Sequence, residues 1–156
     1  MTGQKFIYLA GPITGCGKKE ANDWRDDIRQ CLSENIIGVS PLRCEPLIGR
    51  KYKHSYDDRR FGTTSAISGK NWLDTTLCDM VLAYLPREIN DRRPSYGTVI
   101  ELGWAIGMRK PIIVVSDDPA LINHPLIVDN VNWIFDNFED ALDVIHGLFD
   151  VYTGDK

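Results

Sequence analysis

A single carboxylate, Glu101, stands in the segment of the chain best placed to carry chemistry. Segment 95–104 follows an apolar run at 80–85, opens a helix-like stretch at 97–108, and is followed by a second apolar run at 112–115. The order strand, loop, helix, strand predicts a βαβ unit. In parallel α/β sheets the start of such a helix borders the crevice where ligands bind. A carboxylate there can cap the helix or act as a nucleophile.

The sequence offers two explanations for Glu101. Thr98 and Glu101 fit a capping box, with Thr98 as the N-cap and Glu101 as the third helical residue. A carboxylate in the first turn would also be kept ionised by the helix dipole and the free N–H groups, which suits a nucleophile. Two more polar residues are expected at the same crevice, Tyr8 in the first strand and Asp79 at the start of the third. Their convergence favours chemistry, although Tyr8 can equally be a plain strand residue and Asp79 a turn residue.

Five short apolar runs alternate with helix-like stretches and must position these side chains. The pattern predicts strands at 5–10, 36–40, 80–85, 112–115 and 132–135, and helices at 20–34, 71–78, 97–108 and 138–149. Alternating strands and helices favour a mostly parallel sheet covered on both faces. Right-handed crossovers leave few arrangements. We expect an α/β protein with a flavodoxin-like five-stranded parallel sheet, forming a single domain over 1–156.

Composition narrows the class of protein. The net charge of −4 gives no general attraction to nucleic acid, and no window holds the roughly 18 uninterrupted apolar residues of a membrane span. Four cysteines are widely spaced, and three histidines do not pair with them at zinc-ligand spacing. Because the N-terminal segment is unlike a signal peptide, we expect a cytoplasmic protein with small-molecule partners, without a metal, a membrane or nucleic acid.

Residues 41–70 break the alternating pattern. This long polar segment carries seven basic residues, including Arg43, and only three acidic ones. It leaves the carboxyl end of the second strand, so it can reach the crevice of Glu101. Loops of this length inside a compact domain are often functional. The segment is therefore either a lid that holds an anionic or polar ligand, or a solvated surface loop.

Four motifs, in this order, resemble the nucleoside 2-deoxyribosyltransferase family. They are Tyr8-Leu9-Ala10-Gly11-Pro12, then Cys78-Asp79-Met80-Val81-Leu82-Ala83, then Gly97-Thr98-Val99-Ile100-Glu101-Leu102-Gly103-Trp104-Ala105, then Lys110-Pro111-Ile112-Ile113-Val114. The resemblance runs from about residue 5 to residue 115 and continues more weakly through the last helix. It implies a flavodoxin-like fold and a homo-oligomer whose active sites take residues from a neighbouring subunit.

The resemblance also implies a mechanism. Glu101 would attack the anomeric carbon of the sugar and form a glycosyl–enzyme ester, which a second base or water then attacks. Tyr8 would orient the carboxylate, and Asp79 would contact the base and protonate it as it leaves. These roles fit the chemistry, because a carboxylate stabilises the oxocarbenium-like state and the base leaves poorly until protonated. No cofactor is implied, since the carboxylate does the covalent work.

Ser95 departs from the transferase pattern. Family members that use free nucleosides commonly have aspartate six residues before the nucleophile, whereas the related 5′-monophosphate N-glycosidases resemble this chain in having serine there. A serine hydroxyl can donate to a phosphate that aspartate would repel. Gly97 would leave helix N–H groups open to an anion, and Arg92 and Arg93 would add charge. Ser95 can also contact a free 5′-hydroxyl or simply start a turn.

The leading hypothesis is transfer of deoxyribose from a 2′-deoxynucleoside to another free nucleobase, and the alternative is hydrolysis of a deoxynucleoside 5′-monophosphate. A more distant hypothesis is a nucleotide-binding module without catalysis, because a fold does not fix a function. The remaining substrate-binding candidates come from separate parts of the chain. They are Gly11 and Pro12 after the first strand, Arg43, Trp72 beside a base, and Asn123 facing a neighbour's pocket.

Overall fold

The computed structural model describes residues 3–46, 49–87 and 95–150. Five parallel strands form one sheet in the order β2-β1-β3-β4-β5. Their bounds are β1 Lys5–Ala10, β2 Ile36–Val39, β3 Met80–Tyr84, β4 Ile112–Val115 and β5 Trp133–Phe135. This order confirms the flavodoxin-like α/β fold. From β1 the chain adds β2 on one side of the sheet and then β3, β4 and β5 on the other. A ligand crevice is therefore expected between β1 and β3, at the carboxyl ends of these two strands.

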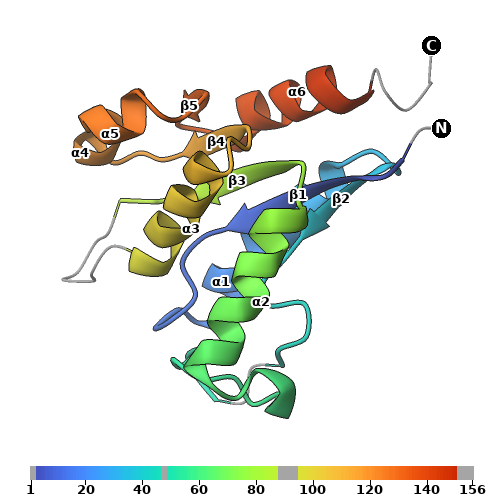
Figure 1. Ribbon diagram of the computed structural model, residues 1–156, viewed down its shortest axis with the longest axis vertical. Helices are drawn as coiled ribbons and strands as arrows, with labels where there is room; N and C mark the ends of the chain where they lie inside the picture. The colour runs from blue at the N-terminus through green and yellow to red at the C-terminus, as the bar shows by residue number, and fades with distance from the viewer. Residues whose placement is uncertain (1–2, 47–48, 88–94, 151–156) are drawn as a thin grey trace.

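Helices cover both faces of the sheet. The helices α1 (Lys18–Cys31) and α6 (Phe138–Phe149) pack on one face. The other face carries α3 (Tyr96–Gly107), with α2 (Thr64–Leu77) beside it and the short helices α4 (Pro119–Ile122) and α5 (Pro125–Val128) further along. Figure 1 shows α2 and α3 side by side in front of the strands. A single 3-10 turn, η1 (Arg59–Phe61), precedes α2.

Alternation along β1 decides which side chains reach the face under α3. Ile7 and Leu9 join the core beneath α1 and α6, whereas Tyr8 and Ala10 join the core with Leu102 of α3. All of these side chains are fully or almost fully buried. The period-two geometry of a strand therefore directs the Tyr8 hydroxyl towards the face that carries α2 and α3.

The helix α2 differs most from the sequence-based prediction. It begins at Thr64, seven residues before the expected start at 71, and the Thr63 hydroxyl caps it by accepting from the Ala66 N–H at 3.2 Å. The buried residues of α2 are Lys70, Asn71 and Thr75, all polar. Because apolar periodicity is the main signal for a helix, a helix with a polar buried face escapes it.

The basic segment is shorter and better packed than expected. Tyr52 and Tyr56 are buried beside Cys16 and Leu42 in a third core cluster. The Tyr52 N–H donates to the Cys16 carbonyl, and the Tyr52 carbonyl accepts from the Gly15 N–H, each at 2.9 Å. The segment thus pairs with the loop that follows β1 and is not merely solvated.

Candidate active site

Glu101 lies in the second turn of α3 and not in the first. The helix begins at Tyr96, and its N-cap is Ser95, whose hydroxyl accepts from the Thr98 N–H at 3.4 Å. The capping box of Thr98 and Glu101, one of the two explanations for this carboxylate, is therefore not formed. Glu101 instead points inward and is only 8 % exposed. The free N–H groups of the helix start are out of its reach, so its ionisation depends on other neighbours.

Glu101 lines a pocket of about 680 Å³, a volume typical of small-molecule sites. Three parts of the chain form its walls: the loop after β1, the basic segment, and the facing sides of α2 and α3. The lining residues are Gly11, Pro12, Ile13, Thr14, Gly15, Cys16, Lys51, Lys53, His54, Tyr56, Ile67, Asn71, Ser95, Tyr96, Gly97, Thr98 and Glu101. The pocket thus lies at the carboxyl edge of the sheet, as expected for this topology.

The two carboxylate oxygens of Glu101 have different surroundings. Oε1 accepts from Nδ2 of Asn71 at 3.4 Å, and Oδ1 of the same amide accepts from Nζ of Lys70 at 2.9 Å. This chain of contacts turns the amide N–H groups of Asn71 towards Glu101. Oε2 is buried without a hydrogen-bond partner, and so is the hydroxyl of Tyr8. The amide contact to Oε1 is long and Oε2 has no partner, so hydrogen bonds hold this carboxylate only weakly.

Burial dominates the ionisation of Glu101 and Tyr8. It raises the pKa of Glu101 to about 7, against the opposing effects of the Tyr8 hydroxyl, the Arg25 and Lys70 charges and the Asn71 amide. The Tyr8 hydroxyl lies close enough to stabilise the carboxylate, although the contact lacks the geometry of a full hydrogen bond. Burial, with the nearby Glu101 charge, raises the pKa of Tyr8 well above its ordinary value. Tyr8 therefore keeps its proton while Glu101 titrates near neutrality.

The structure brings together six of the ten residues proposed from the sequence. Ser95, Gly97, Gly11 and Pro12 line the same pocket as Glu101, and Tyr8 lies beneath Glu101 in the core. These residues come from β1, the loop after it, and the start of α3. The βαβ argument therefore predicted correctly that these residues gather at one edge of the sheet.

Asp79 does not lie with them, which corrects the expected convergence. It immediately precedes β3, and its carboxylate accepts from Nζ of Lys5 at 3.2 Å and from the Phe6 N–H at 2.8 Å. Both partners stand at the amino end of β1. In a parallel sheet this edge is opposite the carboxyl ends where the pocket opens. Asp79 joins the starts of two strands and is absent from the described pocket lining.

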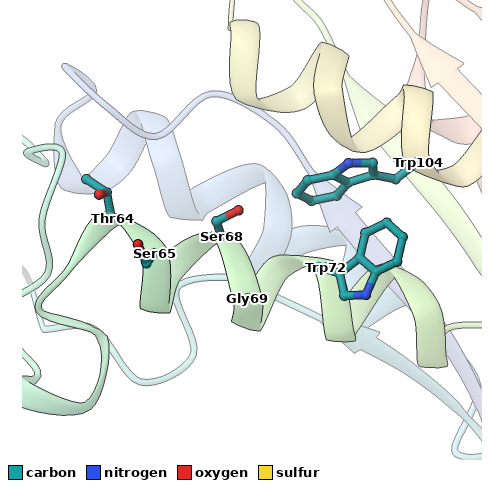
Figure 2. A pocket seen from close by; sticks show the side chains of 6 residues that line it. All are labelled: Thr64, Ser65, Ser68, Gly69, Trp72 and Trp104. Carbon is teal, nitrogen blue, oxygen red and sulfur yellow. The ribbon is translucent and has the colours of Figure 1, made fainter.

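Three further residues proposed from the sequence do not line the pocket that holds Glu101. Arg43 forks onto Asp74, with N–O distances of 2.7 and 2.8 Å. Trp72 packs edge to face with Trp104 at a ring distance of 5.3 Å, and Figure 2 shows both rings turned towards each other beside a separate surface groove. Asn123 ends α4 and donates to the Pro119 carbonyl at 2.8 Å. Arg92 and Arg93 lie outside the described residues.

Sequence reasoning missed several residues around Glu101. Asn71 and Lys70 are buried on α2, and Tyr56 lines the pocket from the basic segment. Arg25 is fully buried on α1 and acts electrostatically on Glu101. One signal was available for Arg25, because it falls four residues after Ala21 and three before Ile28, on the apolar stripe of that helix. No comparable signal marked the polar face of α2.

No group of three or more metal-ligating side chains is found in residues 3–46, 49–87 and 95–150. In the same ranges, no helix is long and apolar enough to cross a membrane. The fold and the pocket thus define an α/β protein with a buried carboxyl group at the carboxyl edge of its sheet.

A family model confirms the resemblance. The model for nucleoside 2-deoxyribosyltransferase matches residues 7–145, and the chain belongs to this family. Its members act on N-glycosidic bonds as transferases or N-glycosidases. No curated protein sequence matches the chain.

Solved structures similar to this chain share its fold. A 2-desoxiribosyltransferase from Leishmania mexicana is 19 % identical, with 92 % of this chain and 98 % of that chain covered and a TM-score of 0.63. A 2-deoxyribosyltransferase from Bacillus psychrosaccharolyticus is 20 % identical, with 88 % and 90 % covered and a TM-score of 0.60. The CMP N-glycosidase BcmB from Clostridium botulinum is 21 % identical, with 90 % and 98 % covered and a TM-score of 0.54. At these identities the likeness establishes the fold alone.

Proposed function

We propose that the protein is a nucleoside 2-deoxyribosyltransferase that cleaves the N-glycosidic bond of a 2′-deoxynucleoside with Glu101 as its nucleophile. One observation carries the proposal: Glu101 is the single carboxylate among the described pocket-lining residues, and its buried Oε2 is unpaired. Family membership supports the type of bond. The pocket needs no cofactor for this chemistry, because the carboxylate itself forms the covalent bond.

The proposed reaction has two steps. An oxygen of ionised Glu101 attacks the anomeric carbon, the bond from that carbon to the base nitrogen breaks, and its electron pair leaves with the base, which takes up a proton. A nitrogen of a second base then attacks the same carbon, the bond from that carbon to the Glu101 oxygen breaks and the carboxylate is regenerated, and the N–H proton of the incoming base passes to the group that protonated the leaving base. Tyr8 keeps its proton, owing to its raised pKa, and so can donate towards the carboxylate throughout. The carboxylate also stabilises the oxocarbenium-like charge in both steps.

The proton for the leaving base needs a donor in the pocket. Asp79 is bound to Lys5 and Phe6 at the other sheet edge, so it is not placed for this role. His54 lines the pocket and is exposed. Histidine is the side chain that most often serves as a general acid or base in enzymes. We therefore assign the role of general acid to His54 in place of Asp79.

A specific observation also favours hydrolysis of a deoxynucleoside 5′-monophosphate. Lys51, Lys53 and His54 line the same pocket as Ser95 and Gly97, and Glu101 is the only acidic residue among the described lining. Two lysines in the same pocket as the start of α3 suit a phosphate. The BcmB relative, a CMP N-glycosidase, carries this chemistry class on the same fold.

A binding protein without catalysis is the rival from another class. The molybdenum cofactor binding protein of Rippkaea orientalis has the same fold, with 18 % identity and a TM-score of 0.57. The fold alone therefore does not require turnover. The buried, unpaired carboxyl oxygen favours an enzyme, because leaving such a group without a partner is costly.

Product analysis separates these functions. Wild type, Glu101→Ala and the surface control Glu34→Ala are each incubated with a deoxynucleoside or its 5′-monophosphate, with and without a second free base. Base exchange on the nucleoside supports the transferase, and release of base from the monophosphate alone supports the hydrolase. Glu101→Ala is expected to abolish either activity, while Glu34→Ala keeps it. Binding of both substrates without any product would instead establish the binding protein.

Assembly into a homo-oligomer is also proposed from family membership. The helices α2 and α3 expose several large apolar side chains, namely Trp72, Leu73, Leu77, Tyr96, Val99 and Ile100. Such a patch is more typical of an interface than of open surface. Asn123 would then be offered to a neighbouring pocket. Analytical ultracentrifugation tests the assembly, and a monomer at micromolar concentration would contradict it.

A further inference from the structure

Arg25 is a fully buried cation without an ion-pair partner among the described residues. Its side chain is 0 % exposed. Its guanidinium contacts backbone carbonyls and the Trp24 ring, whose centroid lies 4.5 Å away, and no described carboxylate bonds to it. A buried charge that is not neutralised by a partner is costly. The burial of the Arg25 charge therefore requires a compensating role.

The guanidinium holds the end of β1 in place. Nε donates to the Leu9 carbonyl at 3.0 Å, Nη2 donates to the Gly11 carbonyl at 2.9 Å, and Nη1 donates to the Ala21 carbonyl of its own helix. Leu9 directly follows Tyr8, and Gly11 lines the Glu101 pocket. A Cβ at Gly11 would come within 2.5 Å of the Trp24 ring. One side chain therefore fixes both the strand that carries Tyr8 and the first residue of the pocket loop.

The charge of Arg25 also reaches the reactive groups. Burial raises the pKa of Tyr8, of Tyr56 and of Glu101, and the Arg25 charge opposes this rise at each of them. Burial lowers the pKa of Arg25 itself to about 10, so it remains charged near neutral pH. The groups that act on Glu101 come from three elements and the basic segment: Tyr8 of β1, Arg25 of α1, Lys70 and Asn71 of α2, and Tyr56. Arg25 and Lys70 are the two cations among them.

We propose that Arg25 is a positioning residue of the active site, which anchors the exit of β1 through backbone carbonyls and supplies positive charge that favours the ionised form of Glu101. The inference rests on the proposed function only for its effect on the reaction rate. That effect follows because Glu101 must be ionised to attack as a nucleophile. Its effect on the Glu101 carboxyl is a property of the free protein. The two parts, anchoring and charge, are separable by substitution.

The test uses two substitutions and a matched control on the same helix. Arg25→Gln removes the charge and keeps an amide donor, whereas Arg25→Lys keeps the charge and loses the planar fork that serves several carbonyls. Arg29→Gln, at an exposed position of α1, removes a charge away from the site. Circular dichroism and thermal melting establish that each variant is folded. Carbon NMR of ¹³C-glutamate-labelled protein, assigned with Glu101→Gln, then follows the titration of Glu101 directly.

We expect the Glu101 midpoint to move to higher pH in Arg25→Gln and to stay near the wild-type value in Arg25→Lys and Arg29→Gln. A rise of one pKa unit would lower kcat/KM about tenfold near pH 6 and about twofold near pH 8, since the rate follows the ionised fraction. Arg25→Lys is expected to raise KM, because the loop after β1 is less firmly held. The acidic side of its pH profile of kcat/KM should stay unchanged.

An unchanged midpoint in folded Arg25→Gln would overturn the electrostatic role. If Arg25→Gln does not fold, Arg25→Lys decides: a wild-type midpoint with impaired kcat/KM supports the proposal, whereas a shifted midpoint or an unimpaired enzyme overturns it. If the wild type turns over no substrate, the proposed function fails, and the NMR titration still tests Arg25 on its own.

Discussion

The carboxyl group of Glu101 and the hydroxyl of Tyr8 face each other in the core as two buried polar groups without a full hydrogen bond between them. Tyr8 comes from β1 and Glu101 from the second turn of α3, so the contact joins two elements that are distant in sequence. Unsatisfied buried groups are costly. Their retention at the floor of a pocket is typical of a functional site, where stability is traded for reactivity.

Glu101→Gln is expected to stabilise the protein at alkaline pH. The pKa of Glu101 is raised from an unfolded value of 4.5 to about 7, so its burial favours the protonated form. Stability linked to this group is therefore fully present below about pH 4.5 and is lost as the pH rises through 7. Glutamine resembles the neutral acid and avoids this loss, which amounts to about 3 kcal/mol at most.

Urea unfolding of wild type and Glu101→Gln at about pH 5 and pH 8.5 measures this effect. The variant should gain stability over wild type at the higher pH and match it at the lower. Equal stability of the two proteins at both pH values would show that Glu101 titrates normally.

Tyr8→Phe is expected to impair the proposed activity mainly on the acidic side of its pH profile. The Tyr8 hydroxyl stabilises the Glu101 carboxylate, so its loss raises the pKa of Glu101 and lowers the ionised fraction near neutrality. Stability should change by less than about 1 kcal/mol, because the hydroxyl makes no full hydrogen bond in the free protein. The measurement is kcat/KM from pH 5 to pH 9, with thermal melting as the check on folding. A uniform loss at every pH would assign Tyr8 a role other than tuning Glu101.

The path of the chain and the place of Glu101 were predictable from residue patterns. Apolar runs such as 80–85 and 112–115 gave the strands of the buried parallel sheet, and their order placed Glu101, Ser95 and Gly11 at one edge. The start of α3 was displaced because Ser95 and Thr98 are both good N-caps and only the fold decides between them.

The surroundings of Glu101 were not predictable in the same way. Lys70 and Asn71 lie on a polar buried face, and Arg25 is a charged residue inside an apolar stripe. Both contradict the rule that polar side chains face water. Asp79 was misplaced for a different reason: it stands at the start of a strand, and in a parallel sheet that edge is opposite the pocket.

Gly11→Ala is expected to destabilise the protein by about 1 to 3 kcal/mol through overpacking. A Cβ at position 11 would lie 2.5 Å from the Trp24 ring and 3.2 Å from Nη2 of Arg25, and neither the buried ring nor the anchored guanidinium is free to move. Gly147→Ala is the control, since a Cβ there meets nothing and lies within α6. That change should stabilise by about 0.5 to 1 kcal/mol through helix propensity. Chemical denaturation of both variants gives the comparison, and a neutral Gly11→Ala would mean that Trp24 yields.

Asp74 is expected to matter far more for stability than Arg43, although the two form a bidentate pair. The Asp74 side chain is 8 % exposed and also lies 3.4 Å from Nζ of Lys70, whereas Arg43 is 39 % exposed. Asp74→Ala leaves the buried Lys70 ammonium without its carboxylate, at a cost of about 3 kcal/mol or more. Arg43→Ala leaves Asp74 paired with Lys70 and should cost about 1 kcal/mol or less.

The double variant tests whether this difference arises from Lys70. Replacing Lys70 with Met in the Asp74→Ala background should recover part of the lost stability, because it removes the unpaired charge. Urea unfolding of the single and double variants measures the coupling. Strictly additive losses would show that Asp74 acts on the fold independently of Lys70. The Lys70 ammonium would then be held in place by its hydrogen bonds to the Pro41 carbonyl and to Asn71.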